Sequence, residues 1–393
     1  TRYLVIFGLF SVLAGIFTGL FQAEKQFLYP TVISFIGNIA IVLCLYFLHR
    51  HLGLNSWTVG QILSATISFF AMFFVLYWHH GFFHNLSFRQ VDWSEIRQFA
   101  LLLLPLVVSG SLSIINQIVD KTIASGLDAG SIAALNFSGR VWNIPLSLLA
   151  VPIATAIFPT FSELALNGSA RVEYESRFEK TLGVSFYLMI PSTFFLFFLS
   201  EPIVRLFFER GAFDPQATAL TSFVVKMYVI GLFAYATSPI MAKVFYSFKN
   251  TTTPLVISAV CVGLNVILNI LLSKILGAGG IALATSIVMI LNFILYTVYL
   301  KKYMNPFSRR LAAETIKIIL SSIPIGIICY FSLPYFQNTS AASLNGFVSL
   351  AIKVAVVGIV SVVPLFALSR AFKLESYAFL KSYALGLLKR FTR

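Results

Sequence analysis

Charged residues are scarce in this chain. Asp, Glu, Lys and Arg make up 11% of its 393 residues, whereas a soluble globular domain carries about 25%. The three cysteines, Cys44, Cys261 and Cys329, lie at spacings that form no disulfide or metal-binding motif. The sequence also has no phosphate-binding glycine loop and no grouping of acids with His or Ser of the kind that acid–base catalysis uses. These absences exclude an ordinary soluble domain and argue against an enzyme.

The chain consists instead largely of long apolar runs. Hydrophobic residues make up 58% of it, and its mean hydropathy is +0.89. The runs are continuous rather than alternating, which predicts helices and not barrel strands. Because a helix needs about 20 apolar residues to cross a bilayer, we predict an all-α polytopic membrane protein with about eleven spans. The predicted spans lie near residues 3–21, 31–48, 57–78, 99–120, 132–160, 181–199, 217–247, 254–273, 280–300, 311–331 and 347–368.

The positions of the basic residues predict the orientation in the membrane. Most of the 28 Lys and Arg lie on every second loop and on the C-terminal tail. The opposite loops and the N-terminus carry only Arg2, Arg50, Lys121, Arg205, Arg210 and Lys274. An excess of Lys and Arg marks the cytoplasmic side, so we expect a cytoplasmic C-terminus. The net charge of +14 then indicates contact with anionic lipid headgroups and not with nucleic acid. Residue 1 falls on the outer side beside a span without a signal peptide, and we expect an odd number of further spans before it.

A weak internal repeat, typical of transporters built from parallel repeats, has an offset of about 220 residues. The segment 30–34 (PTVIS) matches 254–258 (PLVIS), and Gly60 then aligns with Gly280. We therefore expect two six-helix lobes and a terminal helix pair, about 14 spans in a complete protein. Residues 1–88 are assigned to the second half of the first lobe and the start of a linker, 89–305 to the second lobe, and 306–393 to the terminal pair and a basic tail.

One polar stripe runs along the span at 132–160. Its members, at helical spacing on one face, are Asn136, Arg140, Asn143 and Ser147. An unpaired charge at the bilayer centre costs at least about 2.5–3.5 kcal/mol on insertion scales, so Arg140 should face protein or a water-filled cavity. Three prolines in the same span predict bending or local unwinding: Pro145, Pro152 and Pro159.

A second polar stripe lies on the span at 99–120. It consists of Ser109, Ser113, Asn116 and Asp120. Asp120 is the only acid of this stripe, and two interpretations are open. In the first, Asp120 forms a structural ion pair with Arg140 on the neighbouring helix. In the second, both residues line a cavity, where Arg140 binds an anionic substrate and Asp120 binds a cation or acts as a conformational lock.

Two later spans add amide and hydroxyl oxygens. Asn265 and Asn269 lie one helical turn apart and share a face, and Thr285 lies on the following span. These side chains suit Na⁺, and they equally suit hydrogen bonds between helices.

Two segments resemble the MurJ/MviN family of lipid II flippases. The first begins with Ala134–Arg140 (ALNFSGR) and continues through Pro145–Ser147 (PLS) to Val151–Pro159 (VPIATAIFP). The second is Leu206–Asp214 (LFFERGAFD), close to that family's hallmark Arg-Gly-x-Phe segment. The resemblance extends over essentially the whole chain, as spans four to fourteen, and implies the two-lobe bundle of the larger MOP exporter superfamily.

The resemblance implies an alternating-access carrier and not an enzyme. Its substrate is expected to be lipid II, the undecaprenyl-pyrophosphate-linked MurNAc-pentapeptide–GlcNAc that is moved to the outer leaflet for peptidoglycan synthesis. The family's cavity cation matches Arg140, which is expected to meet the pyrophosphate. The other candidate substrate-binding residues are Asn143, Asn136, Ser147 and Asn116. The last two spans, at 311–368, are expected to form a groove for the lipid tail.

A sodium site described for some members of the family maps to Asp120, Asn265, Asn269 and Thr285. Asn269 stands where some members have Asp, so one charge is missing here. Na⁺ or the membrane potential is the expected driving force, with no other metal and no cofactor. The expected location is the bacterial cytoplasmic membrane, as a monomer among membrane lipids.

Two alternatives to this function are left open by the sequence. One is an exporter of a different polyprenyl-linked glycan, such as O-antigen or teichoic acid units. The other is a membrane-embedded lipid-linked glycosyltransferase. An enzyme of that kind needs acids or a base near the membrane face, and here the predicted spans contain only Asp120 and Glu314 as acids.

Overall fold

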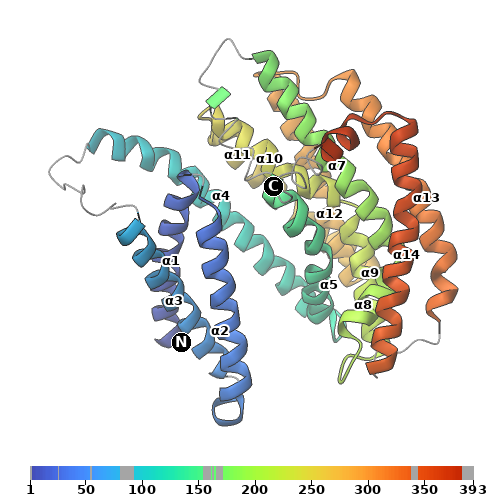
Figure 1. Ribbon diagram of the computed structural model, residues 1–393, viewed down its shortest axis with the longest axis horizontal. Helices are drawn as coiled ribbons and strands as arrows, with labels where there is room; N and C mark the ends of the chain where they lie inside the picture. Colours follow the sequence, from blue (N-terminus) through green and yellow to red (C-terminus); the bar gives the residue numbers. More distant parts are fainter. Residues whose placement is uncertain are drawn as a thin grey trace, which may run out of the picture. The chain divides into compact units, whose positions relative to one another are not determined.

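The computed structural model describes residues 2–24, 26–53, 55–79, 93–153, 161, 163–164, 171–337 and 344–382. All regular secondary structure in these residues is helical (Figure 1). The chain divides into two compact units, Thr1–Glu95 and Ile96–Arg393. The predicted all-α polytopic fold is confirmed.

The first unit contains three helices, α1 (Arg2–Ala23), α2 (Leu28–Leu52) and α3 (Asn55–His79). Helix α3 packs against both α1 and α2. Their small core includes Phe21 of α1 and Met72 and Leu76 of α3, which are all buried.

The second unit contains the remaining helices, which surround a larger core. Helix α7 is the most deeply buried of its long apolar helices, with more than half of its apolar window inside the bundle. In chain order the elements are α4 (Trp93–Ser125), α5 (Ser131–Pro145), the π-helix η3 (Leu146–Ala150), α7 (Arg171–Phe198), α8 (Ser200–Phe208), α9 (Pro215–Val229), α10 (Leu232–Ser247), α11 (Thr252–Leu276), α12 (Ala278–Leu300), α13 (Arg309–Phe336) and α14 (Leu344–Ala371).

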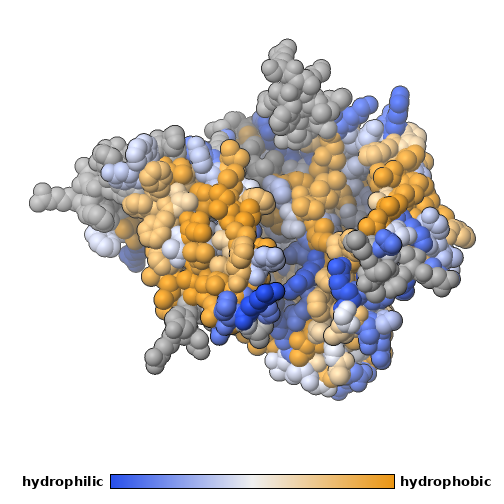
Figure 2. Space-filling view, turned by 60° about the horizontal axis from the view of Figure 1, so that its bottom comes forward, coloured by the Kyte–Doolittle hydropathy of each residue, from blue (hydrophilic) through white to orange (hydrophobic). Residues whose placement is uncertain are grey.

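Eight helices of the described residues are long and apolar enough to cross a membrane, and nine if α9 and α10 form one broken span. Helix α4 covers the predicted span at 99–120, and α5 with η3 covers the first part of the span at 132–160. Residues 154–160 of that span lie outside the described part. Large apolar side chains such as Phe47 and Phe331 point outward, and apolar residues cover much of the surface seen in Figure 2. In a membrane protein this surface contacts lipid.

The region predicted as one helix, 217–247, consists of two helices bent by 47°. Gly231 lies in the break and packs so closely on α12 that a Cβ would come within 2.8 Å of Ser286 Cα. The Ser286 hydroxyl donates to the carbonyl oxygens of Met227 at 2.7 Å and Tyr228 at 2.9 Å. The single-helix prediction is therefore wrong, because the apolar run is continuous in sequence while a contact with a distant helix stabilises the break.

The unwinding predicted from the prolines is confirmed next to Pro145. Helix α5 ends at this residue and continues as the π-helix η3. Proline has no backbone N–H and cannot donate the usual helical hydrogen bond, and a wider π turn is one way in which a helix accommodates this missing bond. Pro152 lies in the short helical stretch that follows, and Pro159 lies outside the described residues.

The internal repeat has a structural counterpart, with a corrected alignment. Helices α2 and α11 both have 25 residues and are each followed by a capping glycine, Gly53 and Gly277, with φ/ψ of 51/−130° and 56/−136°. Both glycines have the positive φ that side-chain-bearing residues rarely adopt. The offset of this pair, 277 minus 53, is 224 residues. Gly280 therefore corresponds to Ser56, and the predicted pairing of Gly60 with Gly280 is wrong by one helical turn.

Candidate functional site

The polar stripe of α5 lies on an uncovered face of the second unit. Asn136, Arg140, Asn143 and Ser147 are all exposed, whereas Ser138 and Val141 on the other side of the same helix are buried. Helical periodicity produces this division, since the four polar residues recur every three or four positions. The sequence-predicted residues therefore form one continuous polar surface.

The Arg140 guanidinium lies over the ring of Phe137, with Cζ 5.7 Å from the ring centroid. The described side chains form no ion pair between Arg140 and Asp120, so the ion-pair interpretation of these two residues is wrong. A guanidinium that is exposed and steadied by a ring presents its N–H donors to an anion, and phosphate is the anion that its planar fork suits best.

A separate buried polar cluster joins α4, α11 and α12. Asn269 donates from Nδ2 to Asp120 Oδ1 at 2.6 Å and to Asn265 Oδ1 at 2.8 Å. Asn265 donates in turn to Thr285 Oγ1 at 3.4 Å. Asn265, Asn269 and Thr285 are buried, with Asn269 fully so. The structure thus brings together all four residues to which the sodium site was mapped.

Asn116 belongs to this cluster and not to the stripe of α5. Its Nδ2 lies 3.5 Å from Asp120 Oδ2, one turn away on α4. Two buried carbonyl oxygens here, Asn116 Oδ1 and Asn269 Oδ1, have no hydrogen-bond partner. Oxygens left unpaired in a buried site beside a carboxylate fit a hard cation, which takes oxygen ligands. The donor set is therefore compatible with Na⁺ at a total side-chain charge of −1.

Three aromatic residues that the sequence did not single out lie at the bend between α9 and α10. Trp142 of α5 packs on Tyr228 and Tyr235, with ring centroids 5.3 and 4.5 Å away. Trp142 Nε1 is buried without a partner. No periodic pattern in a single helix identifies such a group, because its members come from three helices.

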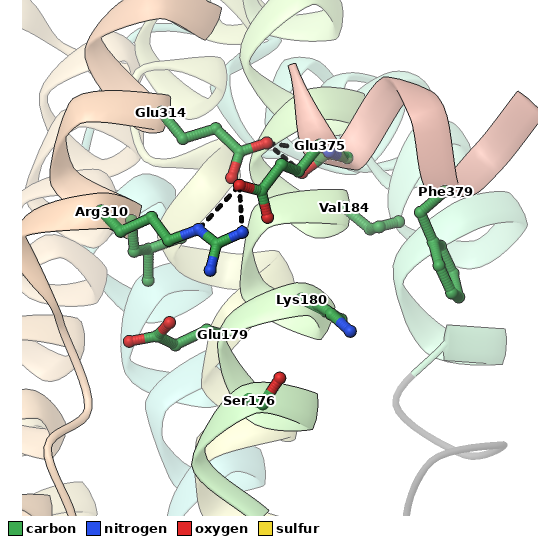
Figure 3. Close-up of a pocket in the computed structure, with 10 residues that line it drawn as sticks. Ser176, Glu179, Lys180, Val184, Arg310, Glu314, Glu375 and Phe379 are labelled. Atoms are coloured by element: carbon green, nitrogen blue, oxygen red, sulfur yellow. Dashed lines mark hydrogen bonds and ion pairs between the residues drawn. The ribbon is translucent and has the colours of Figure 1, made fainter. Parts of the chain in front are cut away.

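A small cavity of about 60 Å³ lies where α7, α13 and the short helix at 375–382 meet (Figure 3). Glu314 accepts from the backbone N–H and the hydroxyl of Ser376, at 2.8 and 2.9 Å. Arg310 and Glu375 point toward one another and form an ion pair. The cavity is too small for a lipid headgroup. The contacts around it hold residues 375–382, which we call the tail helix, against the bundle.

The apolar helices define a polytopic helical membrane protein. An exposed polar stripe and a buried polar cluster at membrane depth are typical of transporters, including those of lipids. The model of the lipid II flippase MurJ matches residues 1–383, and the chain belongs to the MurJ family. That family is described as a flippase and not as an enzyme, in agreement with the sequence-based prediction.

Individual relatives agree with this assignment. A probable lipid II flippase MurJ from Rhizobium tropici is 26% identical over 84% of this chain and 62% of the relative. One from Borreliella burgdorferi is 26% identical over 85% of this chain and 66% of the relative. The solved structure of a lipid II flippase MurJ in an inward closed conformation has a TM-score of 0.65 and 26% identity, covering 90% of this chain and 71% of that one. The chain thus spans less than two thirds of the length of these two sequence relatives.

Proposed function

We propose that this protein is a lipid II flippase, a carrier that moves undecaprenyl-pyrophosphate-linked MurNAc-pentapeptide–GlcNAc from the inner to the outer leaflet. The observation that carries the proposal is the exposed stripe on α5, with Arg140 at its centre, in a chain of the MurJ family. The protein acts as a monomer in the bacterial cytoplasmic membrane, with its C-terminus in the cytoplasm and no nucleic-acid partner.

The stripe binds the headgroup near its pyrophosphate. The guanidinium of Arg140 donates N–H bonds in a fork, which two phosphate oxygens accept together. Asn136, Asn143 and Ser147 supply neutral donors and acceptors along the same face. The polyprenyl tail stays in lipid, so only the polar headgroup needs a polar path across the membrane.

Transport follows from differential affinity. A ligand shifts the balance between inward- and outward-open states only if it binds one of them more tightly. Arg140 therefore holds pyrophosphate in one state and releases it in the other. The two lobes rock around the site, as in carriers built from repeats.

The cluster around Asp120 holds a sodium ion that is coupled to this change. Asp120 supplies the charge, and the amide oxygens of Asn265 and Asn269 and the hydroxyl of Thr285 supply neutral ligands. The cluster ties α4 to α11 and α12, so an ion bound there favours arrangements in which these helices are together. A site with one carboxylate binds more weakly than one with two, which leaves the membrane potential as a second driving force.

The test uses cells depleted of their own lipid II flippase. Wild type and Arg140→Ala are expressed at equal levels, and an externally added toxin that cleaves lipid II reports how much has reached the outer leaflet. We expect rescue by wild type and loss in Arg140→Ala. Failure of a well-expressed wild type would refute the proposed substrate and favour another polyprenyl-linked glycan. Full rescue by Arg140→Ala would remove Arg140 from the binding site.

A further inference from the structure

A large cavity lies in the second unit, at the helix ends opposite the basic loops. Its volume is about 1160 Å³. It is formed by the α4–α5 connection, the α8–α9 connection and the α11–α12 turn, and we call it the outer cup. A cavity of this size accommodates a ligand larger than a monosaccharide, since ligand pockets in proteins measure about 300–1,000 Å³.

Three phenylalanine rings form one wall of the outer cup. Phe137 packs against Phe208 and Phe213, with centroids 4.9 and 5.1 Å apart, the second pair edge to face. All three are partly exposed and line the cavity. Phe208 and Phe213 belong to the segment 206–214 (LFFERGAFD) that was singled out in the sequence. The binding of pyrophosphate by the stripe on α5 assigns no function to this segment.

Thr221 adds a buried polar group to the lining of the outer cup. Its side chain is 1% exposed and lines the outer cup, and its hydroxyl has no hydrogen-bond partner. Other buried threonines in these helices are satisfied: Thr218 donates to Glu209 at 2.7 Å, and Thr237 donates to its own helix. A buried hydroxyl left unpaired is destabilising, so Thr221 Oγ1 is poised for a ligand group.

The charges of the outer cup are nearly balanced. Arg210 donates to the carbonyl oxygens of Leu206 and Phe207, and Asp214 caps α9 by accepting from the N–H of Ala217. Both charges therefore bond to the adjacent helix ends, the C-terminal end of α8 and the N-terminal end of α9. Exposed polar side chains remain at Asp128 and Gln216. Such a lining does not select a pyrophosphate, because cations are not in excess, and it does not suit a polyprenyl tail, because polar groups interrupt the apolar wall.

Aromatic faces combined with neutral hydroxyl and amide partners match a sugar ring. A sugar has apolar C–H faces that stack on rings and hydroxyl edges that pair with Asp, Gln and Thr. The outer cup also adjoins the stripe, since Phe137 lines the cup and the guanidinium of Arg140 lies over the Phe137 ring. In lipid II the first sugar is bonded directly to the pyrophosphate, so neighbouring sites for the two groups match the order of the substrate.

We infer that the outer cup is a glycan subsite that binds the N-acetylhexosamine disaccharide of the headgroup on the outer side of the membrane. This inference rests on the proposed function for its substrate. Phe137 and Phe213 stack on the sugar, Thr221 pairs with a hydroxyl or acetamido group, and Gln216 and Asp128 bind the remaining edge. The subsite retains the headgroup after the pyrophosphate has left Arg140.

The test measures binding of a soluble disaccharide that has neither lipid nor phosphate. The full chain in lipid nanodiscs is titrated with N,N′-diacetylchitobiose and followed by saturation-transfer NMR. We expect saturable binding by wild type and an apparent Kd about fivefold higher in Thr221→Val, which removes one hydrogen bond without changing shape. Phe213→Leu and Gln216→Ala should weaken binding as well, and Gln216 is exposed, so its replacement leaves folding intact. Thr237→Val, an isosteric change at a buried threonine outside the cup, is the matched control and should bind as wild type.

Each outcome decides the inference. Absence of binding by wild type, or equal binding by Thr221→Val, Phe213→Leu and Gln216→Ala, overturns it. Displacement of the disaccharide by farnesyl phosphate assigns the cup to the lipid tail and overturns it also. Disaccharide binding with the expected variant effects, in a protein that fails to expose lipid II in depleted cells, upholds the subsite and refutes only the proposed substrate.

Discussion

Gly231 packs directly against Ser286, so that a Cβ on the glycine would lie 2.8 Å from Ser286 Cα. This contact sits at the 47° bend between α9 and α10 and fastens the bend to α12. The Ser286 hydroxyl donates to the carbonyl oxygens of Met227 and Tyr228 in the last turn of α9. A single small residue and a single hydroxyl thus hold a break in an otherwise continuous apolar segment.

Replacing Gly231 with Ala should destabilise the protein. The added methyl group meets backbone atoms and not a flexible side chain, so the helices must separate, at a cost of about 1–3 kcal/mol. Thermal unfolding of the purified protein in detergent measures the loss. Gly263→Ala on α11 is the matched control, because a Cβ there meets nothing within 4 Å. Equal unfolding temperatures for the two variants would contradict the close packing described for Gly231.

Replacing Asn269 with Asp should strengthen sodium binding. The substitution adds a second carboxylate beside Asp120, and the repulsion between the two is relieved when a cation binds. The sodium-dependent rise in unfolding temperature should therefore be larger in Asn269→Asp than in wild type. Asp120→Asn removes the only formal charge of the cluster and should abolish the rise.

Choline chloride at equal ionic strength separates ion binding from screening in that experiment. A rise that is the same in sodium and in choline would mean that the cluster is a structural hydrogen-bond network alone. The same conclusion would follow if Asp120→Asn kept the full sodium effect.

Replacing Arg140 with Lys should lower transport without abolishing it. Lysine keeps the charge but loses the planar fork that binds two oxygens together, which we expect to reduce lipid II exposure about tenfold. Arg140→Gln, which keeps donors but has no charge, should reduce it further. Unfolding temperatures should stay near wild type in both, since Arg140 is exposed and forms no ion pair among the described residues. Activity of Arg140→Gln above that of Arg140→Lys would show that charge is not what the site uses.

Replacing Glu314 with Ala should release the tail helix. Ser376 loses the carboxylate that accepts from both its N–H and its hydroxyl, so local opening of 375–382 becomes easier by about 1–2 kcal/mol. Hydrogen exchange resolved by mass spectrometry should show at least about tenfold faster exchange in this segment. Glu179→Ala changes another acid of the same cavity that makes no hydrogen bond to the tail, and it should leave the exchange rates unchanged.

Residues within one helix could be grouped from the sequence alone. The apolar runs predicted the helices, since burial in lipid needs about 20 consecutive apolar residues. The stripe from Asn136 to Ser147 was predictable because helical spacing decides which side chains share a face, and the structure leaves that face uncovered. The unwinding after Pro145 followed from the chemistry of proline itself.

Relations between helices depended on the tertiary structure. The bend at Gly231, the contact of Asn269 with Asp120 and the outer cup all arise where segments distant in sequence meet. Hydrophobic periodicity shows which face of a helix is apolar but not which neighbour covers it, because lipid and protein interior are equally apolar. The sequence by itself therefore determined the helices, their polar faces and the expected topology, and packing of small and polar residues between helices decided where those faces converge.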